Sequence, residues 1–214
     1  MIADPRDHAD DVHAPSAIAA GIAEAARRIG AASDVLLASH RRPDGDGTGS
    51  MAALALLLRA RGKRATIFAP DLIPRRYKWL PAAKTAVQRL PADARFDATI
   101  VVDCADPKLL GDSMPPEPQR GALITLDHHA SGRPFGEVAI CDPSAAACAV
   151  LVARIAHQLG WDIRRCAARA PAGLPAGRAG CGSAAAAVMR RSPPRAGRAR
   201  RARPTSRDRG GCRR

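Results

Sequence analysis

Residues 34–62 read DVLLASHRRPDGDGTGSMAALALLLRARG. The segment begins with an apolar run of strand length, 34–40, and it ends with a longer apolar run, 51–62, that predicts a helix. Between them lies a loop rich in glycine and aspartate, which favours a tight turn. A strand followed directly by a helix is the repeating unit of α/β proteins. The segment therefore predicts the first strand and the first crossover helix of a parallel sheet.

The same alternation continues on both sides of this segment. Helical spacing of apolar residues precedes it, and four further strands and a final helix follow it. In chain order we predict a helix over 16–30, strands over 64–70, 96–106, 121–129 and 136–143, and a helix over 144–160. The strand 136–143 is expected at an edge of the sheet. We predict one α/β domain over 16–163: a parallel sheet with helices on both faces.

The two ends of the chain differ from this domain. Residues 1–15 indicate a flexible leader. The segment 164–214 contains 15 arginines, no lysine and one acidic residue, Asp208, so it carries all of the net charge of +14. Arg, Ala, Gly, Pro and Ser dominate it, and we expect disorder because so few apolar residues cannot offset the entropy of folding. A basic tail of this kind predicts non-specific binding to nucleic acid.

Composition also excludes several classes of protein. No apolar run reaches the roughly 18 residues that a membrane span needs, and the N-terminus lacks a signal-peptide pattern. None of the six cysteines forms a C-x-x-C pair, which argues against a zinc ribbon and a disulfide framework. We expect a cytoplasmic protein in which Cys104, Cys141 and Cys148 are buried free thiols.

Metal-ligating side chains stand at the ends of three predicted strands. They are His40, Asp44 and Asp46 after the first strand, Asp103 after the third, and Asp127, His128 and His129 after the fourth. The carboxyl ends of parallel strands converge on one crevice, so these groups are expected to meet. Carboxylates and imidazoles without thiolates suit Mn²⁺, Mg²⁺ or Fe²⁺.

Each of these motifs alone is weak evidence. An Asp-Gly-Asp-Gly turn is commonly a surface turn, a His-His pair is commonly structural, and an aspartate often simply ends a strand. All three in order, each after a predicted parallel strand, favour a metal site. The loop glycines would let Asp44 and Asp46 point towards two different ions, and Thr48 or Ser50 is expected to cap the helix 51–62.

Three stretches resemble successive motifs of the DHH phosphoesterase superfamily. They are HRRPDGDGTGS (40–50), VVDCAD (101–106) and LDHHASGRPFGEVAICDPSAAA (126–147). YKWLP (77–81) is similar to the branch that contains bacterial oligoribonucleases which also dephosphorylate 3′-phosphoadenosine 5′-phosphate. The resemblance covers residues 34–163, and its motifs are specific.

The resemblance implies a set of roles, a cofactor and a reaction. His40, Asp44 and Asp103 would hold one Mn²⁺, and Asp46, Asp103 and His128 a second, with Asp103 bridging. Asp127 would orient His128, His129 would face the scissile phosphate, and Arg133 is a weaker candidate for a phosphate contact. With Mg²⁺ or Fe²⁺ as alternatives to Mn²⁺, the two ions would activate a water molecule for hydrolysis of short oligoribonucleotides or 3′,5′-bisphosphate nucleotides. Relatives imply a homodimer.

The chain departs from the family after Ile163, where no further acidic motif and no second domain follow. The composition of 164–214 is typical of GC-rich DNA translated in the wrong frame, so we hypothesise a truncated or frameshifted chain with an incomplete catalytic domain; a genuine basic tail is the alternative. An exopolyphosphatase-like or pyrophosphatase-like hydrolase, a cyclic-dinucleotide hydrolase, a nucleic-acid-binding protein and an inactive enzyme also stay open.

Overall fold

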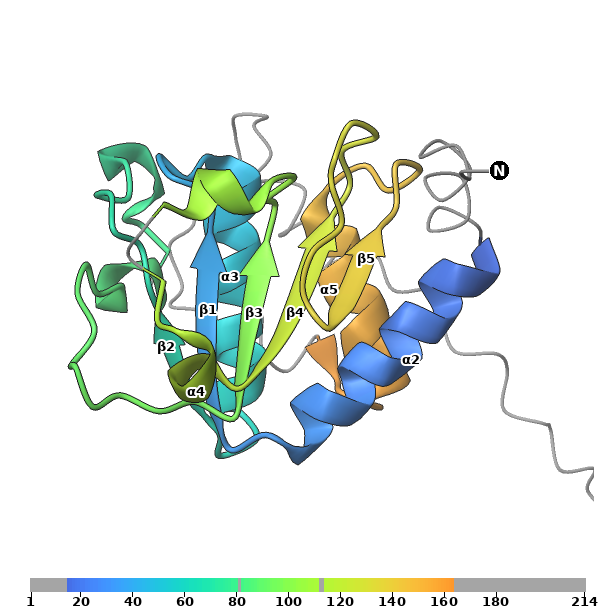
Figure 1. The fold of residues 1–214 in the computed structure, drawn as a ribbon, viewed down its shortest axis with the longest axis horizontal. Helices are drawn as coiled ribbons and strands as arrows, with labels where there is room; N and C mark the ends of the chain where they lie inside the picture. Colours follow the sequence, from blue (N-terminus) through green and yellow to red (C-terminus); the bar gives the residue numbers. More distant parts are fainter. Residues whose placement is uncertain (1–14, 81, 112–113, 164–214) are drawn as a thin grey trace, which may run out of the picture.

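A computed structural model describes residues 15–80, 82–111 and 114–163. The predictions made for 164–214 and for nearly all of the leader lie outside these residues. The described chain forms one five-stranded sheet with the order β2-β1-β3-β4-β5 (Figure 1). The strands are β1 (Asp34–Ser39), β2 (Arg64–Ile67), β3 (Ala98–Val102), β4 (Ala122–Asp127) and β5 (Val138–Cys141).

All four pairs of neighbouring strands are parallel, so the arrowheads in Figure 1 point to the same edge of the sheet. In the register, Val102 of β3 pairs with Ser39 of β1 on one side and with Leu126 of β4 on the other. The carboxyl ends of the three central strands are therefore level. The chain passes from β1 to β2 in one direction and places β3 on the other side of β1, which is where ligand crevices form in such sheets.

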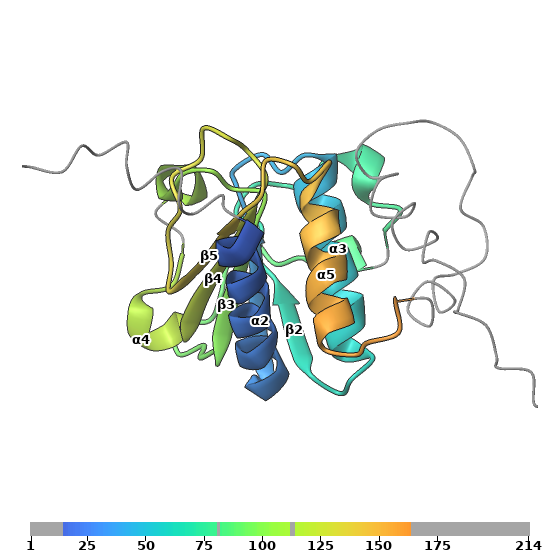
Figure 2. The ribbon, with the colours of Figure 1, turned by 90° about the vertical axis from the view of Figure 1, so that its right-hand side faces the viewer.

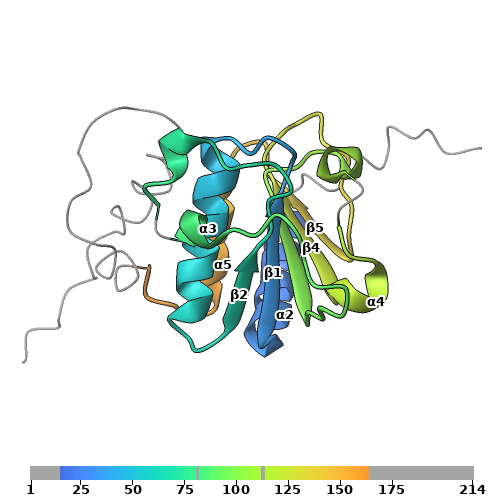
Figure 3. The ribbon, with the colours of Figure 1, turned by 90° about the vertical axis from the view of Figure 1, so that its left-hand side faces the viewer.

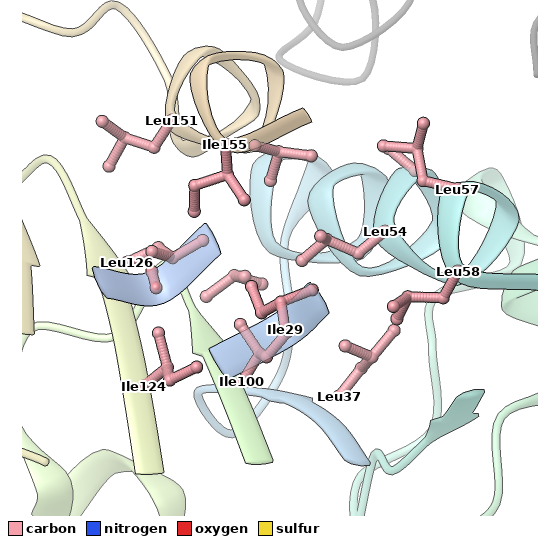
Figure 4. Packing of buried hydrophobic residues seen from close by; sticks show 14 of the residues in the cluster. Ile29, Leu37, Leu54, Leu57, Leu58, Ile100, Ile124, Leu126, Leu151 and Ile155 are labelled. Atoms are coloured by element: carbon pink, nitrogen blue, oxygen red, sulfur yellow. The ribbon is translucent and has the colours of Figure 1, made fainter. Parts of the chain in front are cut away.

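Three long helices pack on one face of the sheet. They are α2 (Pro15–Ala31), α3 (Gly45–Arg59) and α5 (Cys148–Gln158). α5 lies beside both α2 and α3 (Figures 2 and 3). Ile29, Leu54 and Ile155 meet the inward side chains of the central strands there (Figure 4). This apolar layer rests on aliphatic side chains, as the low aromatic content requires.

The opposite face is covered by shorter segments. The 3₁₀ helix η3 (Pro107–Leu110) contributes Leu110, which packs against Val101 and Leu123, and Phe135 adds to the same cluster. The short helix α4 (Glu117–Arg120) also lies on this side (Figure 3). The predicted α/β fold with helices on both faces is confirmed, but the two layers are unequal.

The remaining helical turns belong to the segment that connects β2 to β3 along the chain. They are η1 (Arg75–Tyr77) and η2 (Ala82–Thr85). Among the described residues, no helix is long and apolar enough to span a membrane.

Two predicted helix boundaries are wrong. α3 begins at Gly45 rather than at residue 51, because the Asp44 side chain caps it by accepting hydrogen bonds from the amides of Asp46 and Gly47. Thr48 and Ser50 therefore lie inside the helix and do not cap it. α5 begins at Cys148 rather than at residue 144. The three glycines of 45–49 disfavour a helix in isolation, so the sequence pattern concealed the early start.

Candidate metal centre

The three strand ends bring their polar side chains into one cluster. His128 Nε2 lies 3.4 Å from Asp46 Oδ2 and 3.8 Å from Asp103 Oδ1. His40 Nε2 lies 3.9 Å from the other Asp103 oxygen. His40 and His128 are more than 80 positions apart in sequence. They come close together because the parallel strands that precede them end at the same edge of the sheet.

Three groups of possible metal ligands share one residue, Asp103. The first comprises His40, Asp44 and Asp103, the second Asp46, Asp103, His128 and Cys148, and the third Asp103, Asp127 and His129. Within each group the ligand atoms all lie within 4.8 Å of one another. Asp103 offers a different oxygen to His40 in the first group than to His128 in the second. The first two groups could therefore hold two adjacent cations with Asp103 between them.

Asp44 caps α3, and Asp46 lies in the first turn of the same helix. Asp44 Oδ1 accepts hydrogen bonds from the Asp46 amide (2.8 Å) and the Gly47 amide (3.1 Å). Burial alone would raise the pKa of Asp44, but these hydrogen bonds lower it below its ordinary value. Asp46 lies inside the turn, where Ser50 Oγ donates to Oδ1 and the Cys148 amide donates to Oδ2.

Asp103 combines a buried side chain, an unusual backbone conformation and a raised pKa. Its backbone has φ 56°, a left-handed conformation that is unusual for a residue other than glycine, and its side chain is buried. Burial and the negative charges of Asp46 and Asp44 raise the pKa of Asp103 to about 7. Three carboxylates so close together need a positive partner, and divalent cations fit this donor set.

The two adjacent histidines point to different partners. His128 Nδ1 is hydrogen-bonded to the Ala145 carbonyl (3.1 Å), and its Nε2 faces the carboxylates. His129 Nδ1 is hydrogen-bonded to Asp127 Oδ1 (2.8 Å), which raises the pKa of His129. The expectation that Asp127 orients His128 is therefore wrong, because residues i and i+2 of an extended chain share a side and residue i+1 points the other way.

Cys148 joins the second group, although sequence reasoning assigned it no role in the site. It is the first residue of α5, and its thiol is fully buried among carboxylates, which raises its pKa strongly. The predicted helix begins at residue 144, so Cys148 is expected inside the helix and not at its first position beside the cluster. As predicted, Cys104, Cys141 and Cys148 are all buried, and among the described residues none of them forms a disulfide.

Arg133 lies beside the cluster rather than in it. With Cys104, Asp127 and Cys141 it lines a cavity of about 10 Å³, room for roughly one water molecule. Asp127 Oδ2 is buried without a hydrogen-bond partner. The Arg133 side chain is exposed, and its backbone amide donates to the Ala105 carbonyl. Its role as a phosphate contact stays a prediction.

Comparison with known proteins identifies what this domain is similar to. A model of the "DHH family, N-terminal domain" matches residues 34–176, so the match extends past Ile163. The chain is 34% identical over 132 residues to the bifunctional oligoribonuclease and PAP phosphatase NrnA of Thermus thermophilus. That alignment covers 60% of this chain and 38% of the relative.

One solved structure shows the same fold, and a second gives a weaker match. An exopolyphosphatase-related protein from Bacteroides fragilis superposes with a TM-score of 0.58 at 24% identity, covering 67% of this chain and 44% of that one. Exonuclease RecJ bound to manganese gives a TM-score of 0.40 at 18% identity, covering 67% of this chain and 40% of that one. The chain spans less than half the length of each of these three proteins.

Proposed function

Because this chain belongs to the DHH family, we propose that it is a metal-dependent phosphoesterase that acts on short oligoribonucleotides or 3′,5′-bisphosphate nucleotides. The observation that carries the proposal is the pair of ligand groups that share Asp103. Two such groups side by side suit phosphoryl chemistry, in which both the attacking and the leaving oxygen must be stabilised. One shared carboxylate would keep the two cations at the short separation that this chemistry uses.

The proposal gives each cation its own ligands. His40, Asp44 and Asp103 would hold the first, and Asp46, Asp103 and His128 the second. When bound, two divalent cations supply a water molecule of lowered pKa and neutralise charge at the phosphate. Mn²⁺ is the ion that we propose first, with Mg²⁺ or Fe²⁺ as alternatives.

His129 is proposed to contact the scissile phosphate. Its hydrogen bond to Asp127 holds the ring and favours the protonated form, because the pKa of His129 is raised above its ordinary value. About half of the side chain is exposed, so a substrate could reach the ring. A cationic imidazole at this position would donate to a phosphate oxygen. Arg133, four residues later, would add a second positive charge.

Substrate and partners are the least constrained part of the proposal. The Thermus relative, whose name assigns it oligoribonucleotides and PAP, supports the substrate class. We propose further that the enzyme acts in the cytoplasm as a homodimer and that the Arg-rich segment 164–214 binds nucleic acid non-specifically.

Hydrolysis by the full chain tests the proposal. The purified protein is incubated with Mn²⁺ and a ribodinucleotide, and separately with 3′-phosphoadenosine 5′-phosphate, beside an Asp103→Ala variant. We expect hydrolysis that falls by more than about a hundredfold in the variant, since loss of even a supporting residue around a metal commonly costs 10–100-fold.

Asp97→Ala is the matched control for this experiment. Asp97 precedes the opposite end of the same strand, where its carboxylate accepts hydrogen bonds from the Ser33 and Asp34 amides. Its removal is expected to affect stability but not the reaction. Equal activity of Asp103→Ala and the unaltered chain would refute the enzyme proposed here.

A further inference from the structure

The second ligand group contains a sulfur atom. Cys148 Sγ lies within 4.8 Å of a ligand atom from each of Asp46, Asp103 and His128. These three residues come from the first turn of α3, the end of β3 and the end of β4, whereas Cys148 is the first residue of α5. Four separate segments of the chain therefore converge at this point.

The position of the sulfur is held by the same residues that form the group. The Cys148 amide donates to Asp46 Oδ2 at 2.8 Å, which anchors the start of α5 against the α3 carboxylate. The thiol donates to the Leu126 carbonyl at 3.3 Å and lies 3.8 Å from Asp103 Oδ1. Ligation of a cation would require the thiol to give up its hydrogen bond to the Leu126 carbonyl.

The other two described cysteines behave differently. Cys104 Sγ donates to the Asp106 carbonyl, and Cys141 Sγ donates to the His129 carbonyl. Neither belongs to any of the ligand groups among the described residues. Both are therefore buried thiols like Cys148, but neither lies in a ligand group. They serve as matched controls for Cys148.

We propose that Cys148 is a protein ligand of the cation held by Asp46, Asp103 and His128. The inference rests on the proposed function, because it requires that this cation binds. Three oxygen or nitrogen donors and one sulfur would give this cation a mixed donor set of the kind that Zn²⁺, Fe²⁺ and Co²⁺ accept. Ligation would replace the S–H bond of Cys148 by a bond to the metal, release one proton to solvent, and break the hydrogen bond to the Leu126 carbonyl.

The consequence is a difference between the two cation sites. The group formed by His40, Asp44 and Asp103 has no sulfur and suits a hard ion such as Mn²⁺ or Mg²⁺. The group with Cys148 favours a softer ion such as Zn²⁺, Fe²⁺ or Co²⁺. The alternative interpretation is that Cys148 only fills space as a small apolar residue, and this interpretation predicts no selectivity.

Cobalt distinguishes the two interpretations without relying on activity. The full chain is titrated with Co²⁺ alone, and absorption is recorded in the visible range, where bound Co²⁺ has ligand-field bands, and in the near ultraviolet, where a thiolate ligand adds an intense charge-transfer band. We expect the charge-transfer band in the unaltered protein and in Cys104→Ser, and its loss in Cys148→Ser. The preference for Zn²⁺ over Mg²⁺ should also fall by at least about tenfold in Cys148→Ser.

Each other outcome has a definite meaning. Visible bands without a charge-transfer band in the unaltered protein would overturn sulfur ligation while leaving the metal-dependent phosphoesterase intact. A charge-transfer band that persists in Cys148→Ser would place the sulfur on another cysteine and also overturn it. No cobalt binding at all would remove both this inference and the metal centre of the proposed function.

If Cys148→Ser fails to fold, a second measurement on the unaltered protein tests the proposal. X-ray absorption at the zinc edge, on the unaltered protein with one equivalent of Zn²⁺, is expected to contain one sulfur at about 2.3 Å. A shell of nitrogen and oxygen alone would refute the assignment.

Discussion

Asp103 is the residue on which the electrostatics of the cluster depend. In the metal-free protein its raised pKa means that the folded chain binds more protons than the unfolded chain between the ordinary value of 3.8 and about 7. The free energy of unfolding should therefore decrease as the pH rises through this window, by up to about 1.4 kcal/mol per pH unit. Below pH 3.8 the contribution is fully present.

Substitution of Asp103 by Asn should remove this pH dependence. In chelator, urea unfolding of Asp103→Asn between pH 4 and 7 is expected to lose less stability than the unaltered chain, although activity is lost. Asp142→Asn is the control, because the pKa of Asp142 is shifted in the opposite direction to that of Asp103. Burial would raise the pKa of Asp142, but hydrogen bonds from Ser144 and Arg154 lower it, so that its removal costs most at neutral pH. Parallel profiles for the unaltered chain and Asp103→Asn would contradict the assignment.

The neighbouring histidines should separate metal binding from catalysis. His128 faces Asp46 and Asp103, whereas His129 pairs with Asp127. We expect His128→Ala to weaken cation binding by about 10–100-fold, and His129→Ala to leave binding nearly unchanged while lowering kcat by about 10²–10⁴-fold. Calorimetric titration with Mn²⁺ and steady-state kinetics measure the two effects. The reverse pattern would exchange the two roles.

The start of α3 is the element that sets the spacing between the two cation groups. Gly47 lies against β1, and a Cβ atom there would sit 2.4 Å from Ser39 Oγ and 3.4 Å from Asp103 Oδ2. Helix propensity alone would make Gly47→Ala favourable by about 1 kcal/mol. Because the contact is so short, we instead expect a net loss of about 1–3 kcal/mol of stability, and weaker metal binding.

A second substitution tests whether this contact is the cause. Ser39 Oγ is buried without a hydrogen-bond partner, so Ser39→Ala alone should be nearly neutral. In the Gly47→Ala background it should recover much of the lost stability, measured by urea unfolding. Gly30→Ala is a suitable helix control, because its Cβ would meet only the terminal methyl group of the Leu159 side chain, at 3.2 Å. Equal losses at both glycines would point to a general effect.

At the scale of the whole molecule, charge and catalysis occupy different parts of the chain. Residues 1–163 have balanced charge, and the 15 arginines of 164–214 carry the excess. If this segment binds RNA phosphates, each phosphate that it neutralises adds about −0.7 to the slope of log affinity against log salt. Fluorescence anisotropy with a short labelled RNA in chelator measures this slope. Deletion of 164–214 should flatten it, and an unchanged slope would place the RNA contacts in the catalytic domain.

Much of the site could be predicted from residues alone. An apolar run that ends in a carboxylate or an imidazole identifies both a buried strand and its functional end, so the positions of Asp103 and of the Asp127–His129 triplet followed from the pattern. The fold class followed from the same alternation of strands and helices. What the pattern left open was which side chains touch, since contact depends on register and on the point where each helix begins.

Sequence by itself therefore determined the α/β class, the five strands and the seven polar residues that follow three of them, because burial and period are local properties of the chain. Tertiary structure alone decided that α3 starts at Gly45, that Asp127 pairs with His129 rather than His128, and that Cys148 enters the cluster. The physical reason is that these contacts join segments that are distant in sequence, and their geometry is set by parallel strand register and helix packing, which no single stretch of residues encodes.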